Sequence, residues 1–312
     1  MRAAAPRIAT ALTALALLST PTRSGAVTGT LDGSYGGPLA IQSSQSNVGG
    51  ANEAFSQMNQ AFGSQLVAAY GTISGGALHL FFTGNLTFWW QLEGNITHWQ
   101  PLDVFIDSGT GGQHQLLMNN PAINQYYDLS KSAGLTFDPG FAADYWLSLG
   151  SSFQGSGWPY LQAYYATLPS PGSGSGVFLG ETVPGPPGTL ANGINPYDIA
   201  ATLDDSNHSG IGNGCGAASA VATSTGVEWA IPLAAIGNPT GCIRVCAYVA
   251  GLDHSTVSNQ VLGGLPPGTC SLTSCASTDF SAIPGDQFFT VCPSSPTPAH
   301  AASWGTLKAI YR

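Results

Sequence analysis

The chain has 312 residues, of which only 7% are charged, and its 16 Asp and Glu against 7 Lys and Arg give a formal charge of −9. So acidic a chain repels phosphate backbones and anionic lipid headgroups, which argues against nucleic acid and membrane surfaces as partners. With 41 Gly and 21 Pro spread along the sequence, long helices are not expected either.

The first 26 residues have the pattern of a secretory signal peptide. Arg2 and Arg7 precede an 11-residue apolar run over 8–18, and small residues follow at 24–26. A basic start, a short apolar core and a small-residue end are typical of cleavable export signals, and a membrane span would need roughly 20 apolar residues. We therefore predict cleavage after Ala26 and a secreted or cell-surface protein with no transmembrane segment. Cleavage leaves four Lys and Arg against sixteen Asp and Glu, a formal charge of −12.

Short apolar or alternating segments between Gly, Pro, Asn and Ser clusters make up the rest of the chain, which favours an all-β fold. Residues 66–73 and 77–84 flank a Ser-Gly-Gly turn and predict a hairpin whose second arm places Leu78, Leu80 and Phe82 on one face. Further strands are predicted at 102–107, 144–149, 160–168, 177–181, 197–203, 227–231, 243–250 and 287–291.

These strands predict a single large disulfide-stapled β-sandwich, of the jelly-roll or immunoglobulin-like kind, over residues 27–292. A Pro-rich stretch at 293–302 without a core pattern predicts a linker. Residues 303–312 form an amphipathic, basic-ended tail that we interpret as a sorting or docking segment.

The cysteines all lie after residue 214, at Cys215, Cys242, Cys246, Cys270, Cys275 and Cys292. An even number in an exported chain indicates disulfides, and no C-x-x-C pair suggests zinc. In the strand predicted at 243–250 the odd-numbered residues form the core row, so the row with Cys242 and Cys246 is expected on an outer face. Those two sulfurs lie about 13 Å apart along a strand, beyond disulfide reach. We predict bridges Cys215–Cys242, Cys246–Cys292 and Cys270–Cys275, and no free thiol.

Several segments of the domain resemble, each in turn, segments of a known group of proteins. They include LDVFIDSGTGGQ (102–113), GLTFDPGFAADYWLSL (134–149), GVEWAIPLAAIGNP (226–239) and DFSAIPGDQFFTV (279–291). In this order they resemble a family of secreted, largely uncharacterised bacterial proteins, some with surface-sorting tails. An opening Asp-Gly, a strand ending in Asp and a late E-x-A-I-P-L segment are more distantly similar to family 9 carbohydrate-binding modules and DOMON-like domains. That resemblance implies a two-sheet sandwich whose loops or face bind sugar.

The densest aromatic cluster contains Trp89 and Trp90, with Trp99 following after several amide residues. Aromatic faces stack on sugar rings, and neighbouring amides bind hydroxyl groups. Trp89, Trp90 and Trp99 are therefore the candidate ligand site. The alternative is that these rings cover one end of the sandwich. Trp146, Trp158 and Trp229 lie in or beside strand patterns and are interpreted as structural.

Carboxylates at strand ends or in loops form two candidate calcium groups: Asp107, Asp138 and Asp144, and Asp204, Asp205 and Asn207. Calcium takes six to eight oxygen ligands, which clustered carboxylates and backbone carbonyls supply. Ordinary turn residues are the alternative, and no cofactor other than a structural calcium ion is indicated.

No motif of a known catalytic site occurs, since the chain lacks G-x-S-x-G and H-E-x-x-H. Glu228, in a strand pattern, is the carboxylate expected to be partly buried, and we interpret it as structural. We therefore predict a non-enzymatic secreted protein that binds neutral glycans or cell-envelope components. A structural or matrix protein of the cell envelope without a small ligand is the alternative, and a carbohydrate-active hydrolase is the third.

Overall fold

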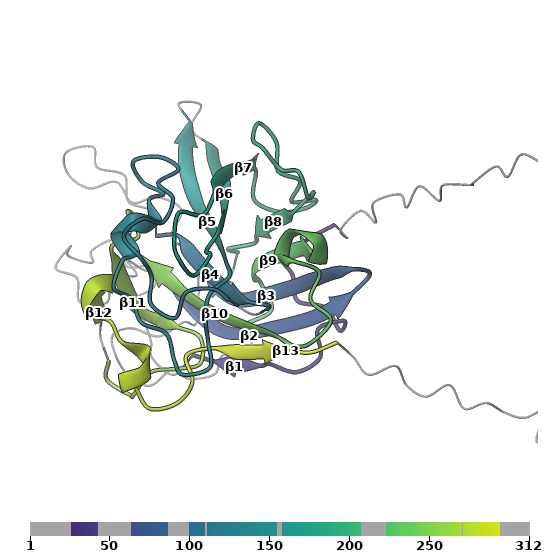
Figure 1. Ribbon diagram of the computed structural model, residues 1–312. Helices are drawn as coiled ribbons and strands as arrows, with labels where there is room; N and C mark the ends of the chain where they lie inside the picture. The colour runs from purple at the N-terminus through teal and green to yellow at the C-terminus, as the bar shows by residue number, and fades with distance from the viewer. Residues whose placement is uncertain are drawn as a thin grey trace, which may run out of the picture.

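The computed structural model describes residues 26–42, 64–86, 100–109, 111–154, 158–206, 223–269 and 271–293. They form two antiparallel β-sheets packed face to face (Figure 1), so the predicted all-β sandwich is confirmed. The helices of this part of the chain are four short 3-10 turns: η1 (Leu129–Ser132), η2 (Leu233–Ile236), η3 (Cys275–Ser277) and η4 (Phe280–Ala282). None of the helices in the described ranges has the length and apolar character needed to cross a membrane.

The first sheet has five strands in the order β1-β2-β3-β9-β8. Their bounds are β1 (Ala40–Ile41), β2 (Gln65–Ser74), β3 (Ala77–Asn85), β9 (Gly226–Pro232) and β8 (Ala200–Leu203). The predicted hairpin is β2–β3, paired from Gln65 opposite Asn85 to Ser74 opposite Ala77. Its two-residue turn is Gly75-Gly76, both with positive φ (57° and 80°), as a turn matching the strand twist requires.

The second sheet has the strand order β12-β11-β10-β4-β5-β6-β7, and a short β13 also pairs with β10. Its strands are β4 (Leu102–Asp107), β5 (Tyr145–Gln154), β6 (Trp158–Thr167), β7 (Gly176–Thr182), β10 (Ile243–Ala250), β11 (Thr256–Val261), β12 (Ser271–Ser274) and β13 (Phe289–Val291). The strand expected at 197–203 is shortened to β8, and β11 and β12 were not expected. Both are rich in Ser, Thr, Asn and Gln, which carry a weak strand signal.

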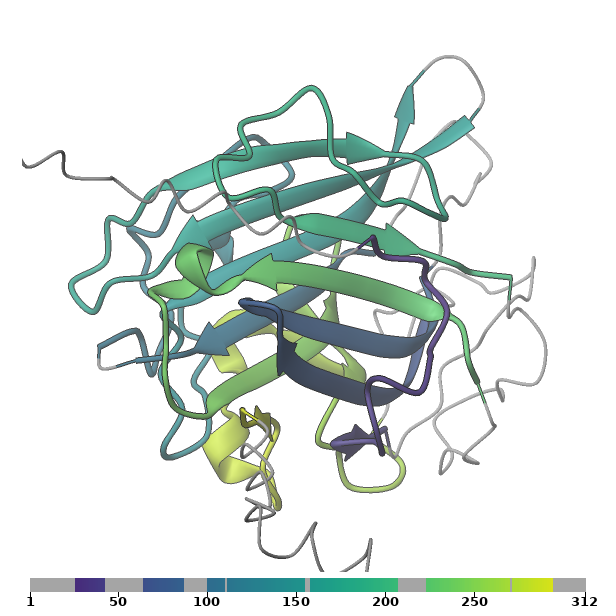
Figure 2. The same cartoon turned by 90° about the vertical axis from the view of Figure 1, so that its right-hand side faces the viewer.

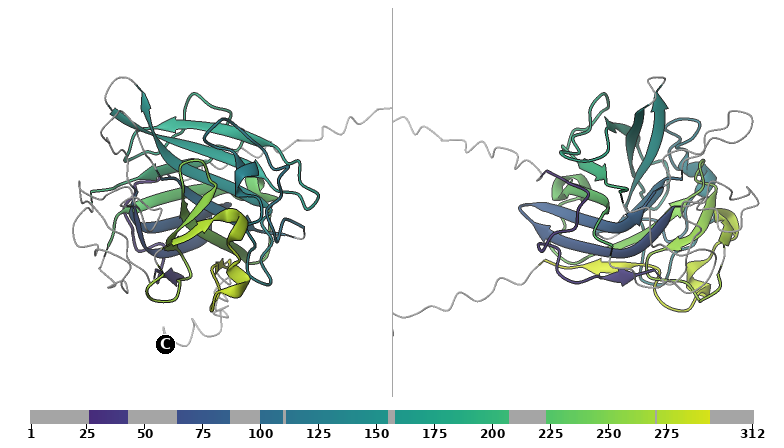
Figure 3. Two further views of the ribbon diagram at one scale, coloured as in Figure 1. Left: turned by 90° about the vertical axis from the view of Figure 1, so that its left-hand side faces the viewer. Right: turned by 180° about the vertical axis from the view of Figure 1, so that it is seen from behind.

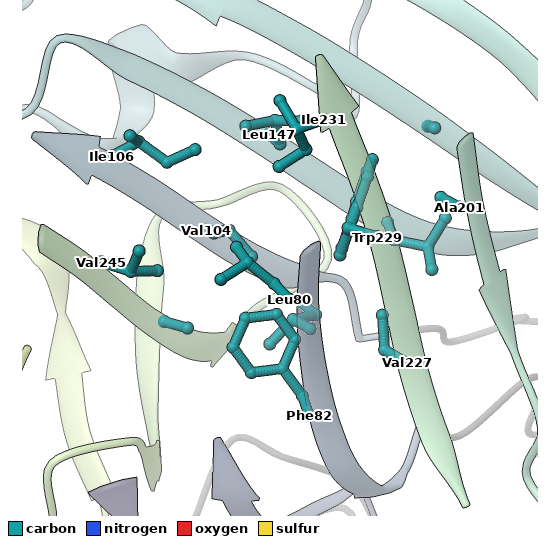
Figure 4. Close-up of a cluster of buried hydrophobic side chains, with 14 of the residues drawn as sticks. Leu80, Phe82, Val104, Ile106, Leu147, Ala201, Val227, Trp229, Ile231 and Val245 are labelled. Carbon is teal, nitrogen blue, oxygen red and sulfur yellow. The ribbon is translucent and has the colours of Figure 1, made fainter. Parts of the chain in front are cut away.

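The inner faces of the two sheets form the main core (Figure 4). Leu80 and Phe82 of β3 belong to the same buried cluster as Val104 and Ile106 of β4, and all four are fully buried. Trp229 of β9 lies in the same layer, completely buried. The predicted inward rows of β3, β4 and β10 are therefore confirmed.

A second core covers the far side of the eight-stranded sheet. Phe105, Cys246 and Tyr248 point to this side and are at most 1% exposed. The connection 111–143 packs over them, and its neighbour Phe280 joins it through a backbone bond from Phe280 N to Thr136 O. The chain carrying η3 and η4, yellow-green in Figures 1 and 3, lies on this side.

The prediction that Cys246 and Tyr248 of β10 lie on an outer face is therefore wrong. Alternation assigns this face to solvent, but the 111–143 connection covers it. In that row only Cys242 and Arg244, at its start, are exposed, and Cys246 and Tyr248 are buried.

The N-terminal segment covers the far side of the five-stranded sheet, and Figure 2 shows it, in purple, passing from β8 and β9 towards β1. Val27 packs on Ala200 and Ala230 and is 1% exposed. The Glu228 carboxylate accepts hydrogen bonds from Thr28 N (2.6 Å) and Gly29 N (2.9 Å). It also accepts one from the Tyr35 hydroxyl at 2.8 Å. Glu228 thus anchors this segment, which agrees with its structural interpretation.

The disulfide Cys242–Cys292 joins the residue before β10 to the residue after β13. The pairing of Ile243 with Val291 brings these two cysteines together. The bridges expected for Cys242 with Cys215 and for Cys246 with Cys292 are therefore wrong.

Cys246 and Cys275 are free, buried thiols of the second core. The bridge expected between Cys270 and Cys275, and the expectation of no free thiol, are therefore also wrong. Cys215 and Cys270 lie outside the described residues.

Candidate functional site

The aromatic residues singled out from the sequence, Trp89, Trp90 and Trp99, lie outside the described residues, so their role stays a prediction. Trp146 and Trp229 are fully buried, which confirms their structural interpretation.

Asp107 and Asp144 lie at neighbouring ends of β4 and β5 and each holds a loop. Asp107 Oδ2 accepts from Arg244 Nη1 (2.9 Å) and from the backbone N of Ala142 (3.3 Å). Asp144 Oδ2 accepts from the backbone N of Ser108 (2.9 Å) and Gly109 (3.0 Å). Burial raises the pKa of Asp144, although these two N–H groups oppose the shift.

Asp138, the third carboxylate of that group, lies elsewhere and accepts from Gln287 N at 2.7 Å. Burial raises its pKa, and the nearby Asp286 and Asp279 add to the shift. Across the described ranges, no three His, Cys, Asp or Glu side chains gather as metal ligands would. Calcium stays a prediction, and Asn207 of the second group lies outside the described residues.

A row of three tyrosines lies at one side of the sandwich, where the two sheets are joined by the loop 183–199. Tyr145 of β5 stacks with Tyr165 of β6, with ring centroids 6.0 Å apart and planes at 26°. Tyr197 of the loop lies 6.4 Å from the Tyr165 ring. We call Tyr145, Tyr165 and Tyr197 the tyrosine row. The exposed fraction of these side chains ranges from 6% for Tyr165 to 39% for Tyr197.

The loop 183–199 that carries Tyr197 is bound to the edges of both sheets. Ala191 pairs with Glu181 of β7, and Thr189 pairs with Ala200 of β8. Of the seven large hydrophobic residues that are exposed in the described chain, three belong to this loop: Val183, Ile194 and Tyr197. The loop therefore carries three of these exposed apolar side chains, and one of them, Tyr197, belongs to the tyrosine row.

The row is held in place by η2 and carries no charge of its own. The Tyr165 hydroxyl donates to the carbonyl of Ala235 at 2.8 Å. Burial raises the pKa of Tyr145, and Asp144 beside it adds to that shift. Burial likewise raises the pKa of Tyr165. At neutral pH the row thus offers uncharged rings and hydroxyls, next to the Asp144 carboxylate.

Sequence reasoning missed this row. Tyr145 and Tyr165 lie within the strands predicted at 144–149 and 160–168, and Tyr197 is the first residue of the strand predicted at 197–203. Their approach depends on how the 183–199 connection folds back, which no local pattern encodes.

A second group of polar side chains lies inside the second core. Asp103 Oδ2 and His254 Nδ1 are 2.9 Å apart, and both side chains are fully buried. His254 has a positive φ of 63°, and its carbonyl accepts from Ser132 Oγ (2.8 Å) and Cys275 Sγ (3.2 Å). A pair with no exposed surface cannot meet a large substrate, so we do not regard it as an active site.

The Tyr248 hydroxyl of this group donates to the Cys275 thiol. Within the described part of the chain no protein group hydrogen-bonds to Asp103 Oδ1, Tyr127 Oη, Trp146 Nε1, Ser148 Oγ or His254 Nε2.

Comparison of the chain with protein-family models, with curated proteins and with solved structures finds no match.

Proposed function

We propose that the chain is a secreted, non-catalytic β-sandwich that binds neutral glycans through the tyrosine row. The observation that carries this proposal is the row itself, with rings graded from buried Tyr165 to half-open Tyr197. Sugar rings present C–H faces that stack on aromatic rings. An exposed tyrosine hydroxyl can donate to or accept from a sugar hydroxyl, and a neighbouring carboxylate can accept from one.

Charge favours neutral over acidic sugars as the ligand. The chain carries a formal charge of −9, and Asp144 is the ionisable acid beside Tyr145. A sulfated or uronic-acid chain would be repelled by that carboxylate and by the overall field. The proposed ligand is therefore a neutral polysaccharide or a neutral glycan of the cell envelope.

The test is binding of the purified exported protein to a glycan array, followed by calorimetry on any hit. Tyr197→Ala should weaken binding at least about tenfold, the equivalent of about 1.4 kcal/mol. Tyr126→Ala is a matched control, because Tyr126 is equally exposed at 39% but is not part of the tyrosine row. Equal binding by wild type and Tyr197→Ala would overturn the assignment to this row.

Two further outcomes separate this proposal from its competitors. Loss of binding in Trp89→Ala or Trp90→Ala but not in Tyr197→Ala would move the site to the tryptophan cluster. Release of reducing sugar by the purified protein would contradict a non-catalytic role.

A structural role in the cell envelope is the second candidate, because both sheets are covered on their outer sides. The N-terminal segment covers one, and the second core covers the other, which leaves little apolar surface for a small ligand. This role predicts that no glycan binds and that removal of residues 303–312 releases the protein from the cell surface.

A further inference from the structure

The turn 195–199 places Tyr197 beside the other two rings of the tyrosine row. It joins the segment that pairs with β7 to the start of β8, and both of its ends are anchored. Ile194 N, just before the turn, donates to Phe178 O of β7 at 2.8 Å. Ile199, the last residue of the turn, is 1% exposed and belongs to the main core. Tyr197 therefore lies on a short stretch of chain between two anchored points.

One side chain closes this turn. Asn195 Oδ1 accepts a hydrogen bond from Ile199 N at 3.0 Å, and Asn195 Nδ2 donates to Ile199 O at 2.8 Å. The side-chain amide thus binds both backbone groups of Ile199, which a neighbouring strand would otherwise bind. An amide can do this because it carries a donor and an acceptor, whereas a carboxylate only accepts.

The backbone of the turn has few alternatives while these bonds are in place. Pro196 fixes its own φ at about −65° and restricts the preceding Asn195 to extended conformations. Asp198 has a φ of 54°, in the left-handed region that is disfavoured for residues other than glycine. Such a conformation persists only where the surrounding contacts hold it. The two bonds from Asn195 to Ile199 enclose Asp198 and contribute to that restraint.

We infer that Asn195 is a positioning residue that holds Tyr197 next to Tyr165 before a glycan binds. The inference rests on the proposed function, in which Tyr197 is the most exposed ring of the site. A loop that already has its bound arrangement loses little conformational entropy when the glycan arrives. If the turn is released, only the fraction of molecules with Tyr197 in place can bind, and the apparent affinity falls by that fraction.

The first test uses the full exported chain without any ligand. With labelled tyrosines, NMR should show contacts between the ring protons of Tyr197 and Tyr165, whose ring centroids lie 6.4 Å apart. Asn195→Ala should lose these contacts and should exchange the Ile199 amide hydrogen faster. Asn192→Gly is the control for general loosening of the loop, because Asn192 donates to β7 and has a φ of 62° that glycine accepts. Ring contacts that survive in Asn195→Ala would overturn the inference.

The second test measures binding of cellohexaose, mannohexaose and xylohexaose by calorimetry. Losing two hydrogen bonds of ordinary net strength shifts an equilibrium about tenfold or more, so Asn195→Ala should weaken binding by about that factor. Asn195→Asp, which keeps the acceptor and loses the donor, should lie between Asn195→Ala and the wild type. In the Tyr197→Ala background the alanine change should have no further effect, because Asn195 acts only through Tyr197. An equal loss in both backgrounds would indicate a general structural role and contradict the inference.

The outcomes distinguish this inference from the proposed function. If Tyr197→Ala weakens binding while Asn195→Ala binds like the wild type, the positioning role is wrong and the glycan site stands. Equal binding by the wild type and Tyr197→Ala would overturn the site instead. If none of the three sugars binds, the ring contacts in Asn195→Ala alone decide whether Asn195 positions Tyr197.

Discussion

Asp144 shows how a single oxygen can hold a loop next to the proposed site. Both backbone donors, Ser108 N and Gly109 N, reach Oδ2, so an amide oxygen could replace it. We predict that Asp144→Asn keeps both bonds and near-wild-type stability at low pH. Asp144→Ala, which leaves both N–H groups without their partner, should lose about 1–3 kcal/mol.

The pH dependence of Asp144 follows from the direction of its pKa shift. Burial raises the folded pKa above the value of 3.8 expected in the unfolded chain. Between the two values the folded state binds more protons, so the wild type loses stability relative to Asp144→Asn as pH rises from about 4 through the folded pKa. Urea melts of both proteins between about pH 3.5 and 8 measure this difference. A difference that does not change with pH would contradict it.

The buried thiols of Cys246 and Cys275 should be unreactive in the folded protein. Burial raises the pKa of Cys275 to about 12 and that of Cys246 well above its usual value. Since the thiolate is the reactive form, neither should react with iodoacetamide in native buffer. In denaturant without reductant both should be alkylated, whereas Cys242 and Cys292 should not. Peptide mapping by mass spectrometry identifies the alkylated cysteines. If Cys246 stays unalkylated in denaturant, it forms a disulfide and the prediction is wrong.

At the scale of the elements, one side chain, Glu228, holds the N-terminal segment against the five-stranded sheet. Glu228 is 7% exposed and accepts from Thr28, Gly29 and Tyr35. We predict that Glu228→Ala lowers the free energy of unfolding by about 1.5–3 kcal/mol, the range for hydrogen bonds to charged groups. Glu228→Gln, which keeps one acceptor, should fall between. Hydrogen exchange at Thr28 and Gly29 should speed up in the alanine variant, and unchanged exchange there would refute the anchoring role.

The elements that could be predicted are those whose local pattern agrees with their surroundings. The β2–β3 hairpin follows from its turn and its alternating apolar arm, and the inner row of β10 follows from alternation alone. The outer row of β10 could not be assigned correctly. Whether Cys246 and Tyr248 meet water or a second core depends on the 111–143 connection, which lies more than a hundred residues away in sequence.

The sequence indicated the chemistry of the proposed site but not its residues. Low charge and surface aromatics indicated stacking on a neutral ligand, and that chemistry is retained in the proposal. The residues differ because Tyr145, Tyr165 and Tyr197 come from two strands and a loop that meet only in the folded chain. Spacing along the sequence carries no information about such a meeting.

For the whole molecule, the loop 183–199 protects the edges of both sheets. Ala191 exchanges two backbone hydrogen bonds with Glu181 at the β7 edge, and Gly185 N donates to Leu203 O at the β8 edge. Exposed strand edges are templates for pairing with other chains. Ala191→Pro removes one N–H and should uncover β7, so we expect it to self-associate at concentrations where the wild type shows none. Ala191→Ser keeps both bonds and serves as the control in light scattering, and equal behaviour of the two variants would count against the capping role.

The position of the Cys242–Cys292 bond determines how mechanical force enters the domain. A pull applied beyond residue 292 passes through the sulfur atoms directly to the start of β10, which lies between β4 on one side and β11 and β13 on the other. The short β13 therefore cannot be peeled off by itself, and the load falls on the middle of the sheet, where strands must shear past one another. With a sequence separation of 50 between the two cysteines, roughly 170 Å of chain stays unavailable to stretching while the bond is intact. A protein held at a surface by its C-terminal end would thus be tethered through an interior strand of the larger sheet.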